Sequence, residues 1–110
     1  MIAAKDTWSH ASAADITDTT ATTLKAAAAD TRYWITDVTI SNMHATQGTR
    51  VDVLSGSTLI YSGPAAANGG GFDHSFSTPL KCGVNEAIKI QCGTAGAAVR
   101  GAVNGFSTAG

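Results

Sequence analysis

Apolar and polar residues alternate with a period of two along most of the chain after residue 30. In the longest run Trp34, Val38 and Ile40 share one parity, while Tyr33 and Ile35 share the other. Such alternation, in a segment rich in aromatic and β-branched residues, predicts a half-buried strand. We therefore expect Trp34, Val38 and Ile40 to face a core.

Shorter alternating runs follow, and glycine, proline and asparagine separate them. Ser55-Gly56-Ser57 and Gly83–Glu86 each predict a tight hairpin turn, and Gly63-Pro64 ends a strand. The glycine-rich segment 68–71 predicts a loop tip. Strands spaced at about 8–12 residues, with no long helical pattern between them, predict a small antiparallel β-sandwich, either jelly-roll-like or immunoglobulin-like. The fold class is all-β.

The predicted core consists of the apolar residues at the inward positions of these runs. Few of them are aromatic, so the core is built mainly from medium-sized aliphatic side chains. The predicted core residues are Leu24, Trp34, Val38, Ile40, Val51, Val53, Leu59, Tyr61, Phe76, Leu80, Ile88, Ile90, Val99 and Val103.

The first thirty residues differ from the rest, because alanine, threonine, aspartate and serine dominate them. Large apolar side chains are limited there to Ile2, Trp8, Ile16 and Leu24. Burial of these few side chains does not offset the conformational entropy that ordering would cost. We therefore expect residues 1–15 to lack fixed structure in the isolated protein. The predicted organisation is an N-terminal arm over residues 1–19 and one domain over residues 20–110. Trp8 has two interpretations: it packs on the sandwich within a first strand, or it anchors the arm on another protein.

Composition and charge exclude several classes of protein. The chain has 110 residues and a net charge of -1, with only 14% charged and 6% aromatic residues. Basic residues are few and scattered, so binding to nucleic acid is not expected. The apolar runs are far shorter than the ~20 residues that a membrane span needs. The first residues lack the features of a secretory signal, so we expect synthesis and folding in a cytoplasm.

Residues capable of chemistry do not form a catalytic or metal-binding pattern. We expect Cys82 and Cys92 to be free, partly buried thiols, because a tight turn at Gly83–Glu86 would hold them too far apart for a disulfide. The histidines show no ligand-like spacing. No Gly-x-Ser-x-Gly motif occurs, and the glycine-rich segments lack the lysine and the following helix of a phosphate-binding loop. We therefore predict a protein that is not an enzyme and that has no metal and no cofactor.

A succession of short segments between residues 20 and 106 is similar to that of a known group of proteins. The segments are Tyr33–Asn42, Gly48–Val51, Ser55–Thr58, Gly63-Pro64, Gly70–Phe72, Thr78–Leu80 and Asn85–Ile88. Together they resemble small β-sandwich structural proteins of tailed bacteriophage virions, especially capsid decoration (cement) proteins. The resemblance implies a component of the capsid surface that is assembled in the host cytoplasm, forms a homotrimer and binds the major capsid protein.

The leading hypothesis is therefore a non-enzymatic decoration protein that binds and stabilises the capsid lattice. The alternatives are a phage tail, fibre or head-fibre domain, a carbohydrate-binding module and a small enzyme. A carbohydrate-binding module usually exposes a planar row of aromatic rings, and we expect the core to consume most of the rings here. Weakly charged surfaces cost little to desolvate, and we expect the N-terminal arm to make the principal capsid contact, so that deletion of residues 1–10 abolishes capsid binding and leaves the fold intact. In the alternative, the arm folds back as an edge strand and the contact is made by the loops, notably residues 68–72. The candidate contact residues are Ile2, Lys5, Asp6, Trp8, His10, Asn68, Gly69, Gly70 and Phe72.

Overall fold

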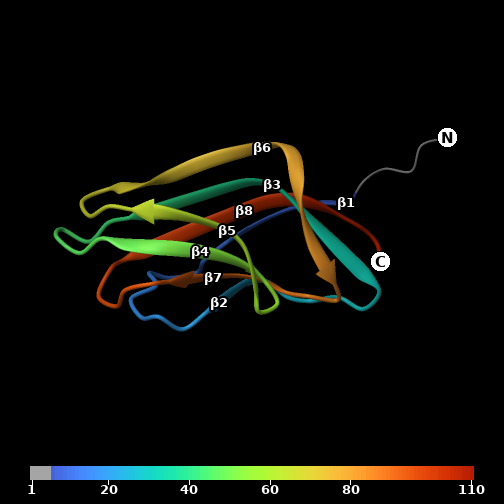
Figure 1. Cartoon of the computed structure of the whole chain (residues 1–110), viewed down its shortest axis with the longest axis horizontal. Helices are drawn as coiled ribbons and strands as arrows, with labels where there is room; N and C mark the ends of the chain where they lie inside the picture. The colour runs from blue at the N-terminus through green and yellow to red at the C-terminus, as the bar shows by residue number, and fades with distance from the viewer. Residues whose placement is uncertain (1–5) are drawn as a thin grey trace.

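The computed structural model describes residues 6–110, and within them it contains eight strands and no helix (Figure 1). The all-β prediction is confirmed. The strands are β1 (Asp6–Ala11), β2 (Thr22–Lys25), β3 (Thr31–Asn42), β4 (Thr49–Ser55), β5 (Thr58–Ala65), β6 (Gly70–Val84), β7 (Ile88–Cys92) and β8 (Val99–Ala109).

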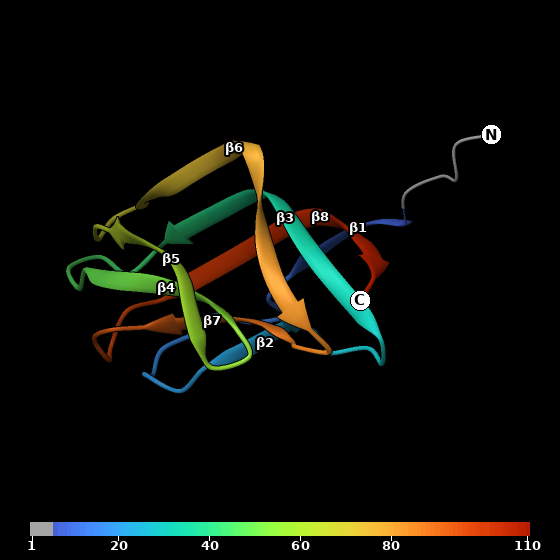
Figure 2. The ribbon, with the colours of Figure 1, turned by 45° about the vertical axis from the view of Figure 1, so that its right-hand side comes forward.

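The strands form two four-stranded sheets that pack face to face, in the orders β1-β8-β3-β6 and β2-β7-β4-β5 (Figures 1 and 2). All pairs are antiparallel, and β1 pairs with β8, β2 with β7, β3 with β6, and β4 with β5. The chain is thus one long antiparallel hairpin that folds over into two layers. This strand order is that of an eight-stranded jelly roll, which decides between the two kinds of sandwich that the sequence left open.

A β-bulge in β3 reverses the parity of its inward side chains. Tyr33 and Ile35 are buried in the first half of the strand, whereas Val38 and Ile40 are buried in the second half. The pairing of β3 with both β6 and β8 shifts between Ile35 and Asp37, which is where the extra residue lies. The expectation that Trp34 faces the core is therefore wrong, because the unbroken alternation on which it depended stops at this bulge.

The rest of the predicted core is largely confirmed. Leu59 is wrong, since its side chain is 55% exposed. Tyr61, Phe76 and Leu80 are only partly buried and pack against the edge of the core. The predicted residues that are buried are Leu24, Val38, Ile40, Val51, Val53, Ile88, Ile90, Val99 and Val103, and the structure adds Ile16, Tyr33, Ile35, Leu54, Ala65, Cys82, Cys92 and Ala97.

Residues 6–11 form an edge strand where the sequence suggested a mobile arm. β1 pairs with β8 along its whole length, and Trp8 lies opposite Gly105. A Cβ atom at Gly105 would lie 2.8 Å from the Trp8 ring, so the absence of a side chain leaves room for the indole. The indole Nε1 donates a hydrogen bond to Ser107 Oγ at 3.1 Å, and the ring packs edge-on against Tyr33. The boundary at residue 20 is thereby corrected, because the sandwich includes β1. The contacts of the Trp8 ring offset the conformational entropy that is lost when β1 becomes ordered.

The two predicted hairpin turns have different outcomes. Gly56 has a φ of 60° and begins the two-residue turn between β4 and β5, as expected. The segment Gly83–Glu86 instead leads from β6 in one sheet to β7 in the other. It is not a hairpin, because β6 ends beside β3 while β7 pairs with β2 and β4.

Candidate functional site

Four connections between strands gather at one end of the sandwich, on the left in Figure 1. They comprise residues 12–21, 43–48, 66–69 and 93–98. We call this surface the loop end. It contains Asn68 and Gly69, two of the residues for which the sequence predicted partner contacts.

Asn42 is the buried residue whose side chain joins two of these connections, 43–48 and 93–98, to the end of β5. Its side chain is fully buried at the end of β3. Its Nδ2 donates to the carbonyls of Gln47 and Ala65 at 2.8 and 3.1 Å. Its Oδ1 accepts from the backbone N–H groups of His44 and Ala98 at 3.1 and 3.2 Å. One amide thus satisfies four backbone groups that belong to different segments, and this fixes their relative positions.

The glycine-rich connection is fixed to its neighbour through backbone hydrogen bonds. The N–H of Asn68 donates to His44 O at 2.6 Å, and the N–H of Gly69 donates to Asn42 O at 2.7 Å. Asn68 and Gly69 both have positive φ, 61° and 88°, which asparagine and glycine tolerate best. The expected loop tip is therefore present, and its conformation is tied to the residue that orders the whole end.

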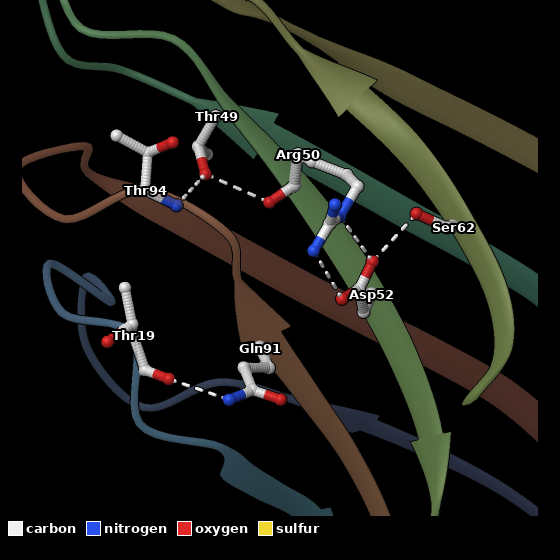
Figure 3. Close-up of polar contacts among 7 residues, drawn as sticks. All are labelled: Thr19, Thr49, Arg50, Asp52, Ser62, Gln91 and Thr94. Carbon is white, nitrogen blue, oxygen red and sulfur yellow. Dashed lines mark hydrogen bonds and ion pairs between the residues drawn. The ribbon is translucent and has the colours of Figure 1, made fainter. Parts of the chain in front are cut away.

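A second group of polar contacts lies on the adjoining outer face of β4 and β5 (Figure 3). Arg50 Nε is 2.9 Å from Asp52 Oδ1, and Arg50 Nη2 is 3.2 Å from Asp52 Oδ2. Ser62 Oγ donates to Asp52 Oδ1 at 2.7 Å. The guanidinium and the carboxylate therefore neutralise each other across adjacent positions of this exposed face.

Two further contacts in Figure 3 link the loop end to the sheet. The N–H of Thr94 donates to Thr49 Oγ1 at 3.0 Å. The side-chain Nε2 of Gln91 donates to Thr19 O at 2.8 Å. The connections 12–21 and 93–98 are thus each held by a side chain of a strand.

Three of the four connections at the loop end present a small, uncharged and partly apolar surface. Met43 is 67% exposed and is its largest apolar side chain. The connections 43–48, 66–69 and 93–98 contain no Asp, Glu, Lys or Arg. The connection 12–21 carries two carboxylates: Asp15 pairs with Arg100 at 2.6 Å, and Asp18 Oδ1 accepts a hydrogen bond from the N–H of Thr20 at 3.1 Å. The other exposed residues of the three uncharged connections are Ala45, Thr46, Ala66, Asn68, Gly69, Gly93, Thr94, Ala95 and Gly96.

Three candidate contact residues of the arm, Asp6, Trp8 and His10, lie at a different place, on the edge strand β1. The Lys25 ammonium lies 5.2 Å from the centroid of the Trp8 ring and 4.9 Å from that of Tyr33. Lys25 Nζ is also 3.4 Å from His10 Nε2. These groups close the edge of the sandwich between β1 and β2. Trp8 is therefore a structural side chain of this edge, while Ile2 and Lys5 lie outside the described residues.

The structure does not bring the two sets of predicted contact residues together. Gly70 and Phe72 lie at the start of β6. Gly70 pairs with Asn42 on β3, and Asn42 pairs on its other side with Val99 on β8. Trp8 pairs instead with Gly105 on the same strand β8. The stretch of β8 between these two levels is about 20 Å long. The loop end and the β1 edge are hence separate surfaces.

Both cysteines are free and buried, as the sequence predicted, although the turn between them differs from the expected one. Burial raises the pKa of the Cys82 thiol from an ordinary 9.0 to about 11, and the nearby Glu86 carboxylate adds to the shift. Burial likewise raises the pKa of Cys92. The folded protein therefore keeps both thiols protonated and unreactive at neutral pH.

This shift predicts how thiol reactivity and stability change in alkali. At pH 8, Cys82 should react with iodoacetamide about 100-fold more slowly in the folded than in the unfolded chain, because its thiolate is scarcer by the same factor. The folded state holds its proton between pH 9 and 11 while the unfolded state releases it, so the free energy of unfolding should fall across that window. Labelling followed by mass spectrometry, together with urea unfolding at several pH values, measures both. Equal labelling rates in the two states would contradict the assignment, and Cys82→Ala should reduce the alkaline loss.

Residues 6–110 contain neither a cluster of metal ligands nor a membrane-spanning helix. No group of three or more His, Cys, Asp or Glu side chains in this range could hold a metal ion. The described part of the chain likewise has no helix that could cross a membrane.

No family model matches the sequence, and no curated protein matches it. Among solved structures, a chain in the crystal structure of dimeric latent PorU from Porphyromonas gingivalis is similar, with a TM-score of 0.61 and 14% sequence identity. The similarity covers 96% of this chain and 13% of that chain. At this level of identity the likeness concerns the fold alone, and it shows that the same sandwich occurs as a small part of a much longer chain.

Proposed function

We propose that this protein is a non-enzymatic structural module of a phage virion, a capsid decoration protein that docks its loop end on the major capsid protein. The observation that supports this most is the combination of an ordered loop end with a weakly charged surface around the exposed Met43. The sequence resemblance supplies the class of partner and a homotrimeric assembly on the capsid surface.

Docking through the loop end costs little free energy. Loops already held by Asn42 lose little conformational entropy when they meet a partner. Small, uncharged residues lose few interactions with water, and the flexible methionine side chain adapts to an apolar recess. Several copies around a symmetry axis gain affinity because each contact raises the effective concentration of the next.

This proposal moves the contact away from the N-terminal segment. The sequence alone suggested that deletion of residues 1–10 would abolish capsid binding and leave the fold intact. In the structure the same deletion removes most of β1 and strips Trp8 from the ring of Tyr33. It would therefore damage the sandwich edge, and it cannot separate binding from folding.

A pair of charge substitutions tests the loop end directly. Met43→Asp should weaken binding to capsids at least tenfold, because a carboxylate would have to be desolvated at the contact. Leu59→Asp is the matched control. Leu59 is also an exposed large apolar residue, but it lies beside the Gly56-Ser57 turn, at the end of β5 that is away from the loop end. Co-sedimentation with empty capsids, assembled from the major capsid protein encoded nearest to this one, measures binding. Sedimentation velocity measures the trimer.

The outcomes separate the hypotheses. Binding of both variants at the affinity of the unmodified protein would exclude the loop end as the contact. Binding to purified tails but not to capsids would favour the tail or fibre alternative. A monomer both free and on the capsid would contradict the trimer.

A further inference from the structure

His44 lies at the centre of the loop end and holds it with three different atoms. Its backbone N–H donates to Asn42 Oδ1 at 3.1 Å, and its carbonyl accepts from the N–H of Asn68 at 2.6 Å. Its ring nitrogen Nδ1 accepts from the backbone N–H groups of Thr46 and Gln47 at 3.2 and 2.9 Å. The ring thus closes its own connection, as the side-chain oxygen of an Asn or Asp does in an Asx turn.

Both ring contacts require the same protonation state of the imidazole. A ring nitrogen that accepts two N–H groups carries no proton, so the ring is neutral and its proton is on Nε2. A proton added at Nδ1 turns this acceptor into a donor that faces two other donors. The N–H groups of Thr46 and Gln47 then lose their partner, and the ring, which is already partly exposed, turns toward water. The closed form of the connection therefore belongs to the neutral ring.

The charged groups that adjoin this part of the loop end already have partners of their own. The connections 43–48, 66–69 and 93–98 contain no titratable side chain other than His44. The titratable residues nearest to them along the adjoining segments are Asp15, Asp18, Asp37, Arg50, Tyr61, Asp73, Cys92 and Arg100. The two arginines pair with Asp52 and Asp15, and each of the other carboxylates accepts a hydrogen bond from a neighbouring hydroxyl or N–H group. Within residues 6–110, no carboxylate contacts the His44 ring and stabilises its protonated form.

We propose that His44 is an acid-sensitive switch of the loop end: the neutral ring holds the connection 43–48 closed, and protonation opens it and releases Met43 from its fixed position. Met43 immediately precedes His44, and its N–H donates to Ala98 O at 2.9 Å, so its exposed side chain projects from the segment that the ring closes. Histidine changes its charge between about pH 5 and 8, so mild acid is the signal. Weaker docking in acid rests on the proposed function, whereas the opening of the connection does not.

NMR of the isolated protein tests the switch without a capsid. At pH 7.5 the nitrogen signals of the His44 ring should identify the neutral form with its proton on Nε2. Between pH 7.5 and 5.0 the amide signals of Thr46, Gln47 and Asn68 should shift together with those of the ring. Amide hydrogen exchange of Thr46 and Gln47, corrected for the intrinsic rate at each pH, should become at least fivefold faster.

Three variants separate the ring from other effects of acid. His44→Asn keeps an acceptor for both N–H groups but cannot take up a proton, so its exchange should not respond to pH in this range. His44→Ala has no acceptor and should exchange fast at both pH values. His74→Asn is the matched control, because His74 lies on β6 and stacks on Tyr61. It should keep the acid response of the unmodified protein.

Co-sedimentation with empty capsids at the two pH values measures the consequence for docking. The unmodified protein and His74→Asn should bind at least fivefold more weakly at pH 5.0 than at pH 7.5, whereas His44→Asn should bind equally at both, which also controls for changes in the capsid.

The two measurements fail in different ways. A proton on Nδ1 at pH 7.5, unchanged exchange of Thr46 and Gln47 in acid, or the same acid response in His44→Asn would overturn the switch. Equal capsid binding of the unmodified protein at both pH values, with the amide changes present, would contradict its role in docking. If Met43→Asp shows that the loop end is not the capsid contact, the proposed function fails and the NMR result alone decides on the switch.

Discussion

Asn42→Ala should lower the free energy of unfolding by about 3–5 kcal/mol, although it removes only one polar side chain. The Asn42 side chain satisfies backbone N–H groups of His44 and Ala98 and carbonyls of Gln47 and Ala65. Each buried group left without a partner costs about 1–3 kcal/mol, and water that enters the loop end recovers part of that loss. Urea unfolding monitored by circular dichroism gives the value.

Asn104→Ala is the control for this substitution, since Asn104 is exposed on β8 and its removal should change stability by less than about 0.5 kcal/mol. Asn42→Asp should also destabilise strongly, because a carboxylate cannot donate to the two carbonyls. If Asn42→Ala unfolds at the same urea concentration as the Asn104 variant, the loop end is held by its backbone contacts alone. The capsid affinity should then be insensitive to Asn42 as well.

Ile35→Ala should cost about 2–5 kcal/mol, because the side chain is completely buried and its removal leaves a cavity in the core. Trp34→Ala should cost only about 1 kcal/mol, mainly through the lost stacking on Phe106. The order is the reverse of what unbroken alternation along β3 predicts. Thermal unfolding of the two variants decides, and a larger loss for Trp34→Ala than for Ile35→Ala would contradict the bulge at Thr36.

Much of the fold follows from local pattern. The alternation at Val51 and Val53, at Ile88 and Ile90, and at Val99 correctly identifies inward positions of three strands. The turn at Gly56 also follows from its own short sequence. Such features are predictable because the pleat of a strand and the geometry of a two-residue turn depend on the residues themselves.

The candidate site was only partly predictable. The glycine-rich tip with Asn68 and Gly69 has a clear signature, because positive φ selects these residue types. Asn42 was missed, although it continues the inward parity of Val38 and Ile40, and a polar residue at such a position is a usable signal. Its full set of partners could not be read from the sequence, since Ala65 and Ala98 lie 23 and 56 residues away along the chain.

The sequence by itself determined that this chain is an all-β sandwich with a lean aliphatic core. Only the tertiary structure decided that the strands have jelly-roll order, that β3 reverses its faces at a bulge, and that β1 is an edge strand. The reason is physical. Alternation is a property of neighbouring residues, whereas a register shift or an edge strand depends on residues such as Gly105 and Trp8, which are distant in sequence and meet only when the sheet forms.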